Sequence, residues 1–139
     1  MLPMSKSWKK SNDMRYTPEN IQELADNEIF VFGSNLAGNH AGGAARTASE
    51  KFGAKWGVGK GLTGQSYAFP TLDDHFQKRS KECLLAAKIN LYACAECNPD
   101  KTFLVTKLGL GIAGYSLEDI QMVFKGEKPE NIILPKEFS

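Results

Sequence analysis

The segment EIFVFGSNLAGNHAGGAARTASEKF, residues 28–52, decides the fold of this chain. Residues Glu28 to Phe32 are almost all apolar, which is typical of a strand that is buried on both faces. A glycine-rich turn from Gly33 to Gly43 follows, and the small residues from Ala44 to Phe52 predict a helix. A buried strand that leads through such a turn into a helix begins a β-α-β unit, so we expect parallel strands.

The alternation of helix and strand continues on both sides of this segment. Upstream, Thr17 as N-cap and Pro18 at the first helical position predict a short helix to about Ala25. Downstream, the sequence predicts a strand at 66–69 that Pro70 ends, a helix at 75–97 capped by Asp73 or Asp74, a strand at 102–106, a helix at 116–124 and a strand at 131–134. We therefore predict an α/β fold, with a mostly parallel sheet and helices on both faces, in one domain over residues 16–139. Residues 1–15 are polar and read as a flexible tail.

The bulk composition is that of a globular protein with no strong surface charge. The 139 residues carry a formal net charge of +1, and 42% of them are hydrophobic. This charge gives no global attraction to nucleic acid or to a membrane. No apolar run reaches the length of a membrane-spanning helix, and the first residues lack the apolar stretch of a signal peptide, so we expect a cytoplasmic protein.

The three cysteines do not suggest a disulfide framework or a metal site. Cys94 and Cys97 match C-x-x-C, but one such pair supplies only half of a structural zinc site. His75 and Cys83 would complete it only if the chain folded back. All three cysteines fall on nearly the same side of one predicted helix, so we interpret them as small core residues and predict no metal and no cofactor.

Near the end of the chain, Gly109, Gly111 and Gly114 form a literal G-x-G-x-x-G. It fails as a dinucleotide fingerprint, because Glu130, at about the required position, precedes the last predicted strand instead of ending it. A P-loop reading of GVGKG fails too, since Gly61 stands where serine or threonine is needed. The glycine-rich turn at 33–43 and the glycine loop at 109–114 nevertheless each follow a predicted strand and precede a predicted helix. This places both of them at the ligand-binding edge of a parallel sheet. Their backbone N–H groups favour a phosphate-bearing ligand.

The order of these motifs resembles a known family. G-S-N-L-A-G-N-H-A-G-G-A-A after the first strand, T-G-Q-S-Y-A-F-P-T in the middle and G-L-G-I-A-G-Y-S-L-E-D-I near the end resemble the macrodomains, which are ADP-ribose-binding modules. The likeness runs from about residue 28 to 124 and is nearest to small bacterial and phage macrodomain-like proteins, many of them without an assigned activity. It implies that Asn35 holds the distal ribose and that the ligand is lined by Gly33, Ser34, Asn35, Gly42, Gly43, Ala44, Gly109, Gly111, Ile112, Ala113, Gly114 and Tyr115.

The sequence also departs from the family pattern. The first asparagine of the family would fall on Phe32, and the acids that hydrolytic members use would fall on Gly42 or Ala113. The adenine-binding aspartate is not recognisable, although Asp13 and Asp26 are available. The resemblance therefore supports a phosphate site better than adenine recognition, and it supports the phosphate site much better than catalysis.

Two charged residues of the first loop and helix are further candidates. His40 contacts a phosphate or polarises a water in one reading, and is an exposed loop histidine in the other. Arg46 lies one turn into the predicted helix and either reaches a phosphate or forms a surface ion pair. If the protein is an enzyme, Asn35 and His40 are the candidate catalytic residues.

We therefore expect a protein that binds ADP-ribose or a related nucleotide diphosphate. If it has an activity, the reaction is hydrolysis of an ADP-ribose ester or glycosidic bond; the missing acids favour binding without turnover. The alternative is a non-enzymatic module for a protein or RNA partner, in which Lys51, Lys55 and Lys60 lie beside Trp56. The sequence does not determine the oligomeric state or the physiological ligand.

Overall fold

A computed structural model describes residues 16–139; the predicted tail at residues 1–15, with Asp13, lies outside the described residues. Five strands form one sheet in the order β2-β3-β1-β4-β5. Three α-helices, α2, α3 and α4, and the short 3₁₀-helix η1 accompany them. The sheet is mostly parallel, so the predicted α/β class is confirmed.

The central strand is β1 (Glu28–Asn35), which grows from the apolar run that opens the segment discussed above. It pairs in parallel with β3 (Ser66–Leu72) on one side and with β4 (Thr102–Val105) on the other. The short β5 (Ile132–Ile133) pairs in parallel with β4. Only β2 (Gly61–Thr63) is antiparallel, and it forms a hairpin with β3.

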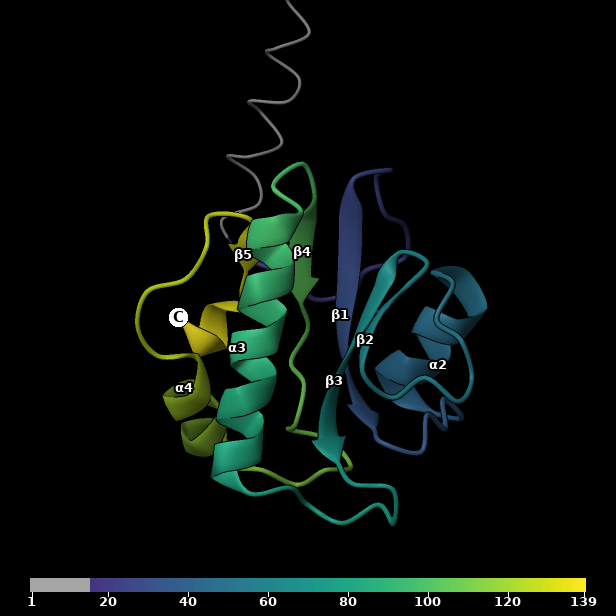
Figure 1. The fold of residues 1–139 in the computed structure, drawn as a ribbon, viewed down its shortest axis with the longest axis vertical. Coiled ribbons are helices and arrows are strands. Elements are labelled where there is room, and N and C mark those ends of the chain that lie inside the picture. The colour runs from purple at the N-terminus through teal and green to yellow at the C-terminus, as the bar shows by residue number, and fades with distance from the viewer. Residues whose placement is uncertain (1–15) are drawn as a thin grey trace, which may run out of the picture.

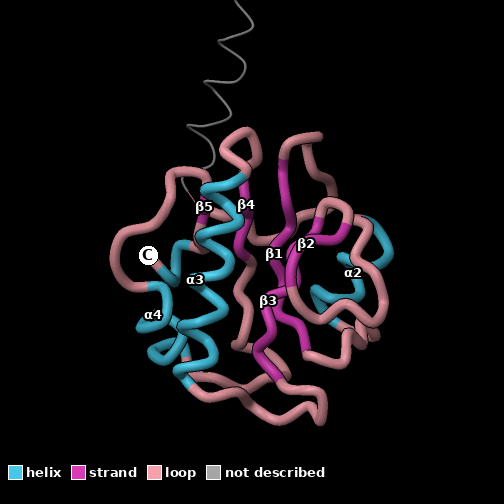
Figure 2. The backbone as a smooth tube through the Cα atoms, in the orientation of Figure 1, coloured by secondary structure: helices cyan, strands magenta, loops and turns pink. Residues whose placement is uncertain are grey.

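Helices cover both faces of this sheet (Figures 1 and 2). On one face, α2 (Gly43–Lys51) packs against Phe30 and Phe32 through its buried alanines, Ala45 and Ala48. Because side chains alternate along a strand, the intervening residues of β1 point to the other face. That face is covered by α3 (Lys81–Cys97) and α4 (Leu117–Phe124), whose buried apolar residues form the larger core with those of the strands: Val31, Phe69, Leu84, Leu91, Phe103 and Ile120.

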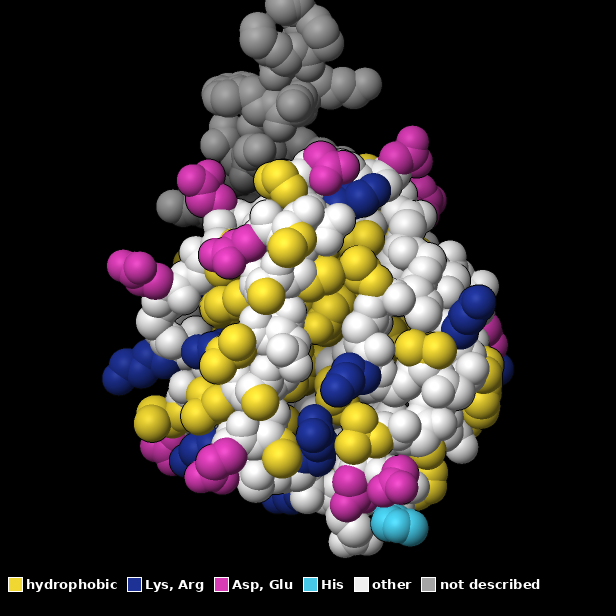
Figure 3. All heavy atoms as spheres, in the orientation of Figure 1, with side chains coloured by type: hydrophobic (Ala, Val, Ile, Leu, Met, Phe, Trp, Pro, Cys, Tyr) yellow, Lys and Arg dark blue, Asp and Glu magenta, His cyan; other side chains and the backbone are white. Residues whose placement is uncertain are grey.

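The outer surface of α3 keeps some apolar character. Leu85 is 36% exposed and Ile89 is 63% exposed. Apolar side chains gather along this helix on the face that Figure 3 shows. Within residues 16–139, no helix has the length and apolar composition needed to cross a membrane.

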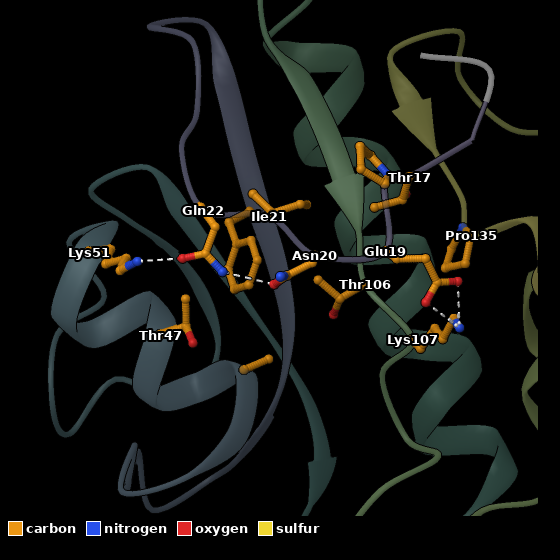
Figure 4. A pocket seen from close by; sticks show the side chains of 13 residues that line it. Thr17, Glu19, Asn20, Ile21, Gln22, Thr47, Lys51, Thr106, Lys107 and Pro135 are labelled. Atoms are coloured by element: carbon orange, nitrogen blue, oxygen red, sulfur yellow. Dashed lines mark hydrogen bonds and ion pairs between the residues drawn. The ribbon is translucent and has the colours of Figure 1, made fainter. Parts of the chain in front are cut away.

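The predicted helix at 17–25 is wrong, because this segment has no regular structure. Thr17 does not cap a helix; its N–H donates to the carbonyl of Leu134 and its hydroxyl donates to that of Ile133. Hydrogen bonds to the end of β5 therefore take the groups that would have started the helix. The segment runs past β4 and β5 towards β1 instead (Figure 4).

The predicted end of β3 is also wrong. Pro70 does not end the strand, which continues to Leu72 and pairs with Ser34 at the proline itself. This is tolerated because β2 pairs only with Ser66–Ala68, so β3 is an edge strand beyond that point. The sequence does not predict the short β2, because its three residues include Gly61 and show no apolar alternation.

The long helix begins at Lys81 rather than at residue 75, and Ser80 is its N-cap, accepting from the N–H of Cys83. Asp73 instead organises a turn in which its carboxylate accepts from the N–H groups of His75 and Gln77. Phe76 lies in this turn with a φ of 62° and is 52% exposed, so it is not part of the core.

All three cysteines are free. Cys94 is half-buried against the larger core, Cys83 is half-buried and Cys97 is exposed, so the core interpretation holds only in part. Within residues 16–139, no three His, Cys, Asp or Glu side chains gather where they could hold a metal ion.

Candidate ligand-binding cleft

A cleft of about 530 Å³ opens where β1, β3 and β4 end. We call it the main cleft. Its walls come from the end of β1 and the following loop, the start of α2, the end of β3 with the turn beyond it, and the loop after β4. The carboxyl ends of neighbouring parallel strands meet at one edge of a sheet, and ligands bind there in open α/β sheets.

Most of the residues that the sequence singled out line this one cleft. They come from two loops that are far apart in the chain and meet because β1 and β4 are neighbours in the sheet. The predicted residues that line the main cleft are Gly33, Ser34, Asn35, Gly42, Gly43, Ala44, Gly109, Gly111, Ile112 and Ala113. Arg46, His40, Gly114 and Tyr115 are not among the residues that line it.

The glycines of the two loops have different roles. Gly109 has a φ of 85°, and a Cβ there would lie 2.7 Å from Cδ1 of Ile120, so the turn and the core both require glycine. A Cβ on Gly33 would lie 3.2 Å from Cβ of Leu108. By contrast, a Cβ on Gly42 or Gly111 would meet no atom within 4 Å, and neither residue has a positive φ. Neither conformation nor packing requires glycine at these two positions of the main cleft.

The first turn of α2 presents unusually bare backbone to the main cleft. Its N-cap is Gly42, which has no side chain to accept from the helix N–H groups, and the first turn has no carboxylate. The serines Ser80 and Ser116, in contrast, cap α3 and α4 with their hydroxyls. Unpaired N–H groups and the positive end of the helix dipole attract an anion.

Asn35 and Ser34 lie at the end of β1, but their polar groups have partners within the protein. The amide of Asn35 donates to the carbonyl of Asn39 and accepts from the N–H of Asn39, both at 3.0 Å. An amide has one further N–H and one further lone pair, so Asn35 keeps the capacity to bind a hydroxyl. The buried hydroxyl of Ser34 donates to the carbonyl of Gly59 at 2.6 Å and so ties the loop that contains Gly59 to the end of β1.

His40 does not lie in the main cleft. Its ring is 1% exposed, packs edge-on against Phe32 and contacts Trp56. Nε2 lies 2.9 Å from the carbonyl of Lys55, which makes this nitrogen the donor. The expectation of an exposed loop histidine is wrong, because the ring of Phe32 and the loop that carries Lys55 and Trp56 enclose the imidazole.

Arg46 is directed along α2 instead of into the main cleft. Its Nε donates to Glu50 at 2.8 Å, one helical turn away, and both side chains are exposed. Of its two readings, the geometry gives the surface ion pair. Such exposed pairs contribute little to stability.

Tyr115 anchors the second glycine loop from behind. Its hydroxyl lies 2.8 Å from the carbonyl oxygen of Thr71 and 2.7 Å from that of Arg79, and it accepts from the N–H of Arg79. The amine of Lys78 lies over its ring. Burial raises the pKa of the Tyr115 phenol. Tyr115 therefore ties the loop 109–115 to the end of β3, and Gly114 turns the chain towards it with a φ of 74°.

The sequence reasoning missed several residues of the main cleft, and Lys107 is the most important of them. It follows Thr106 at the end of β4, and its amine binds Glu19 at 2.9 Å and Glu137 at 3.2 Å. Thr71 from the end of β3 and Phe76 from the turn beyond it also line the main cleft. The position of Lys107 directly before the glycines was the available signal.

A second, smaller cleft of about 260 Å³ adjoins the main cleft, and we call it the side cleft. The two share Ala44, Thr106 and Lys107. Figure 4 shows Gln22 and Lys51 pointing toward each other at one end of the side cleft and Glu19 facing Lys107 at the other. Its remaining lining is polar and uncharged or apolar: Thr17, Pro18, Asn20, Ile21, Phe30, Thr47 and Pro135.

Comparisons with known proteins do not assign this chain to a family. No family model, no curated protein and no solved structure matches it. The resemblance to macrodomains therefore stays a prediction from the motifs, and the function must be inferred from the two clefts.

Proposed function

We propose that this protein binds ADP-ribose or a related nucleotide diphosphate in the main cleft. The observation that carries the proposal is that Gly42 and Gly111 line the same cleft although nothing within the protein requires glycine there. Because glycine has no Cβ, a ligand can approach the backbone closely and accept hydrogen bonds from its N–H groups. Hydrogen bonds to a charged ligand contribute about 1.5–3 kcal/mol each.

The charges and the shape of the clefts support this assignment. The uncapped start of α2 and the amine of Lys107 favour an anion in the main cleft. The side cleft continues from this point and offers amide and hydroxyl groups beside apolar surface. An elongated ligand with a phosphate centre and an uncharged polar ring at one end fits this succession of groups.

We propose binding without turnover. Within residues 16–139, no aspartate, glutamate or histidine lines the main cleft. General acid–base catalysis most often uses such a group within hydrogen-bond reach of the reacting atoms, and the amine of Lys107 is a poor base because Glu19 and Glu137 raise its pKa. Asn35 holds a hydroxyl of the ligand. His40 has a structural role, because it packs against Phe32 and bonds to the carbonyl of Lys55.

Calorimetric titration with ADP-ribose tests the proposal, with ADP, AMP and NAD in parallel. We expect ADP-ribose or ADP to bind more tightly than AMP, and Gly111→Glu to weaken this binding at least tenfold, because it places a negative charge against the phosphates. Asn90→Glu, on the exposed surface of α3, adds the same charge away from both clefts and is the matched control. No heat with any nucleotide from folded protein would reject the proposal, and RNA would then be the next ligand to titrate.

A further inference from the structure

We propose that Lys107 is the side chain that recognises the ligand's negative charge, and that Glu19 and Glu137 compete with the ligand for it. This inference rests on the proposed function for the identity of the ligand, and on the geometry of Lys107 for its chemistry. It predicts that the two carboxylates bound to Lys107 weaken ligand binding in the wild-type protein.

The position of Lys107 gives it this role. Among residues 16–139, it is the only lysine or arginine that lines the main cleft, and it also lines the side cleft. Any anion held at the start of α2 and the loop after β4 therefore has one side-chain cation to meet. An ammonium group on a flexible stem can turn toward a phosphate without a change in the backbone.

In the structure this amine is bound to carboxylates. Nζ of Lys107 lies 3.0 Å and 2.9 Å from the two carboxylate oxygens of Glu19, and 3.2 Å from Oε2 of Glu137. Glu19 comes from the irregular segment before β1, and Glu137 from η1 (Lys136–Phe138). The two carboxylates raise the pKa of Lys107, and a backbone hydrogen bond together with Lys107 lowers the pKa of Glu137 below its ordinary value.

These ion pairs are weak enough to be exchanged. The side chain of Glu19 is 75% exposed and those of Lys107 and Glu137 are 39% and 38% exposed. Exposed ion pairs of this kind contribute little to stability. A phosphate that also accepts hydrogen bonds from backbone N–H groups binds the ammonium of Lys107 more strongly than an exposed carboxylate does. Ligand entry then replaces carboxylate by phosphate at Lys107, and the two glutamates return to water. A ligand with more negative charge makes this exchange more favourable, so diphosphates are preferred over monophosphates.

The experiment uses two probes, ADP-ribose and inorganic pyrophosphate, each titrated by calorimetry at low salt. The variants are Lys107→Met and the double variant Glu19→Gln with Glu137→Gln. Lys81→Met removes the same charge from the exposed first turn of α3 and is the control for the lysine. Glu82→Gln with Glu96→Gln, also exposed on α3, is the control for the carboxylates. Circular dichroism establishes that each variant is folded.

We expect Lys107→Met to weaken both probes about tenfold or more, as the loss of one charge-assisted hydrogen bond predicts. The double glutamine variant should bind both probes about fivefold more tightly, because the competing ion pairs are gone. Binding of pyrophosphate that depends on Lys107, without binding of ADP-ribose, would reject the proposed function and keep this inference. Binding of ADP-ribose that is unchanged in Lys107→Met, or not tightened in the double variant, would overturn the inference and keep the function. No binding of either probe would reject both.

Discussion

The two glycines Gly109 and Gly111 allow a sharp test of the distinction between structural and ligand-facing glycines. We consider replacing each by alanine. At Gly109 the φ of 85° lies in the left-handed region, which costs an L-residue roughly 1–2 kcal/mol. The new Cβ would also lie 2.7 Å from Cδ1 of Ile120, a residue that is 1% exposed and cannot move into water. Overpacking of a core adds about 1–3 kcal/mol.

Replacing Gly111 has none of these costs. Its Cβ meets no atom within 4 Å and its φ is not positive. Alanine also restricts the unfolded chain, which stabilises a protein by about 0.4–1 kcal/mol at a compatible position. This unfolded-state gain applies at Gly109 as well, so the net expectation is a loss of about 1–5 kcal/mol for Gly109→Ala and a small gain for Gly111→Ala.

Urea unfolding followed by circular dichroism measures both values. We expect the two midpoints to move in opposite directions while the dependence on urea stays the same, which keeps the comparison a two-state one. Equal destabilisation by the two alanines would refute the reasoning, because it would mean that Gly111 is also required by the fold. The proposal of a ligand-facing glycine would then lose its principal support.

Three further predictions concern the residues around the clefts and the core. Tyr115→Phe should cost about 1–3 kcal/mol in urea unfolding, since the buried carbonyl of Thr71 and the half-buried backbone groups of Arg79 lose their hydrogen-bond partner; an unchanged midpoint would contradict this anchoring role. His40→Ala should cost about 2–4 kcal/mol in the same assay through lost packing, and a fully stable variant would speak against burial of the ring. Burial raises the pKa values of Tyr67 and Tyr92 to about 12, so both phenols must stay neutral in the folded protein. The contribution of the two neutral phenols to the free energy of unfolding should therefore be fully present below pH 10 and be lost as the pH rises toward 12. An ultraviolet titration in which every tyrosine ionises near pH 10 would refute this prediction.

The central part of the fold could be predicted because its signals are local. The apolar runs that became β1 and β4 and the small residues of α2 are contiguous in sequence, and parallel pairing follows from the helices between them. The errors lie where tertiary contacts decide. Thr17 has an N-cap pattern, yet its hydroxyl bonds to β5, which the local sequence does not reveal. Asp73 caps a tight turn and not a helix, so α3 begins later.

The candidate site divides in the same way. Glycine-rich loops after strands are visible in sequence, and both reach the main cleft. The side cleft was not predictable, because one of its walls is the irregular segment at residues 17–22, for which the sequence predicts a helix. The ion pairs of Lys107 were hidden for the same reason: Glu19 lies 88 residues away in sequence. The burial of His40 depends on its contact with Phe32 across a loop that has no regular pattern.

The place of β1 in the middle of the sheet also affects how the chain reaches its native state. One edge of β1 is completed by β3, but the other waits for β4, whose first residue, Thr102, pairs with Glu28. Pairings between strands that are distant in sequence slow folding, because the entropy of closing a long loop is lost before any stabilising contact forms. During synthesis at roughly 5–20 residues per second, the second edge of β1 stays open for a few seconds. In that interval an apolar strand with unpaired backbone groups is exposed to other chains, so the nascent protein is most prone to aggregate before β4 emerges.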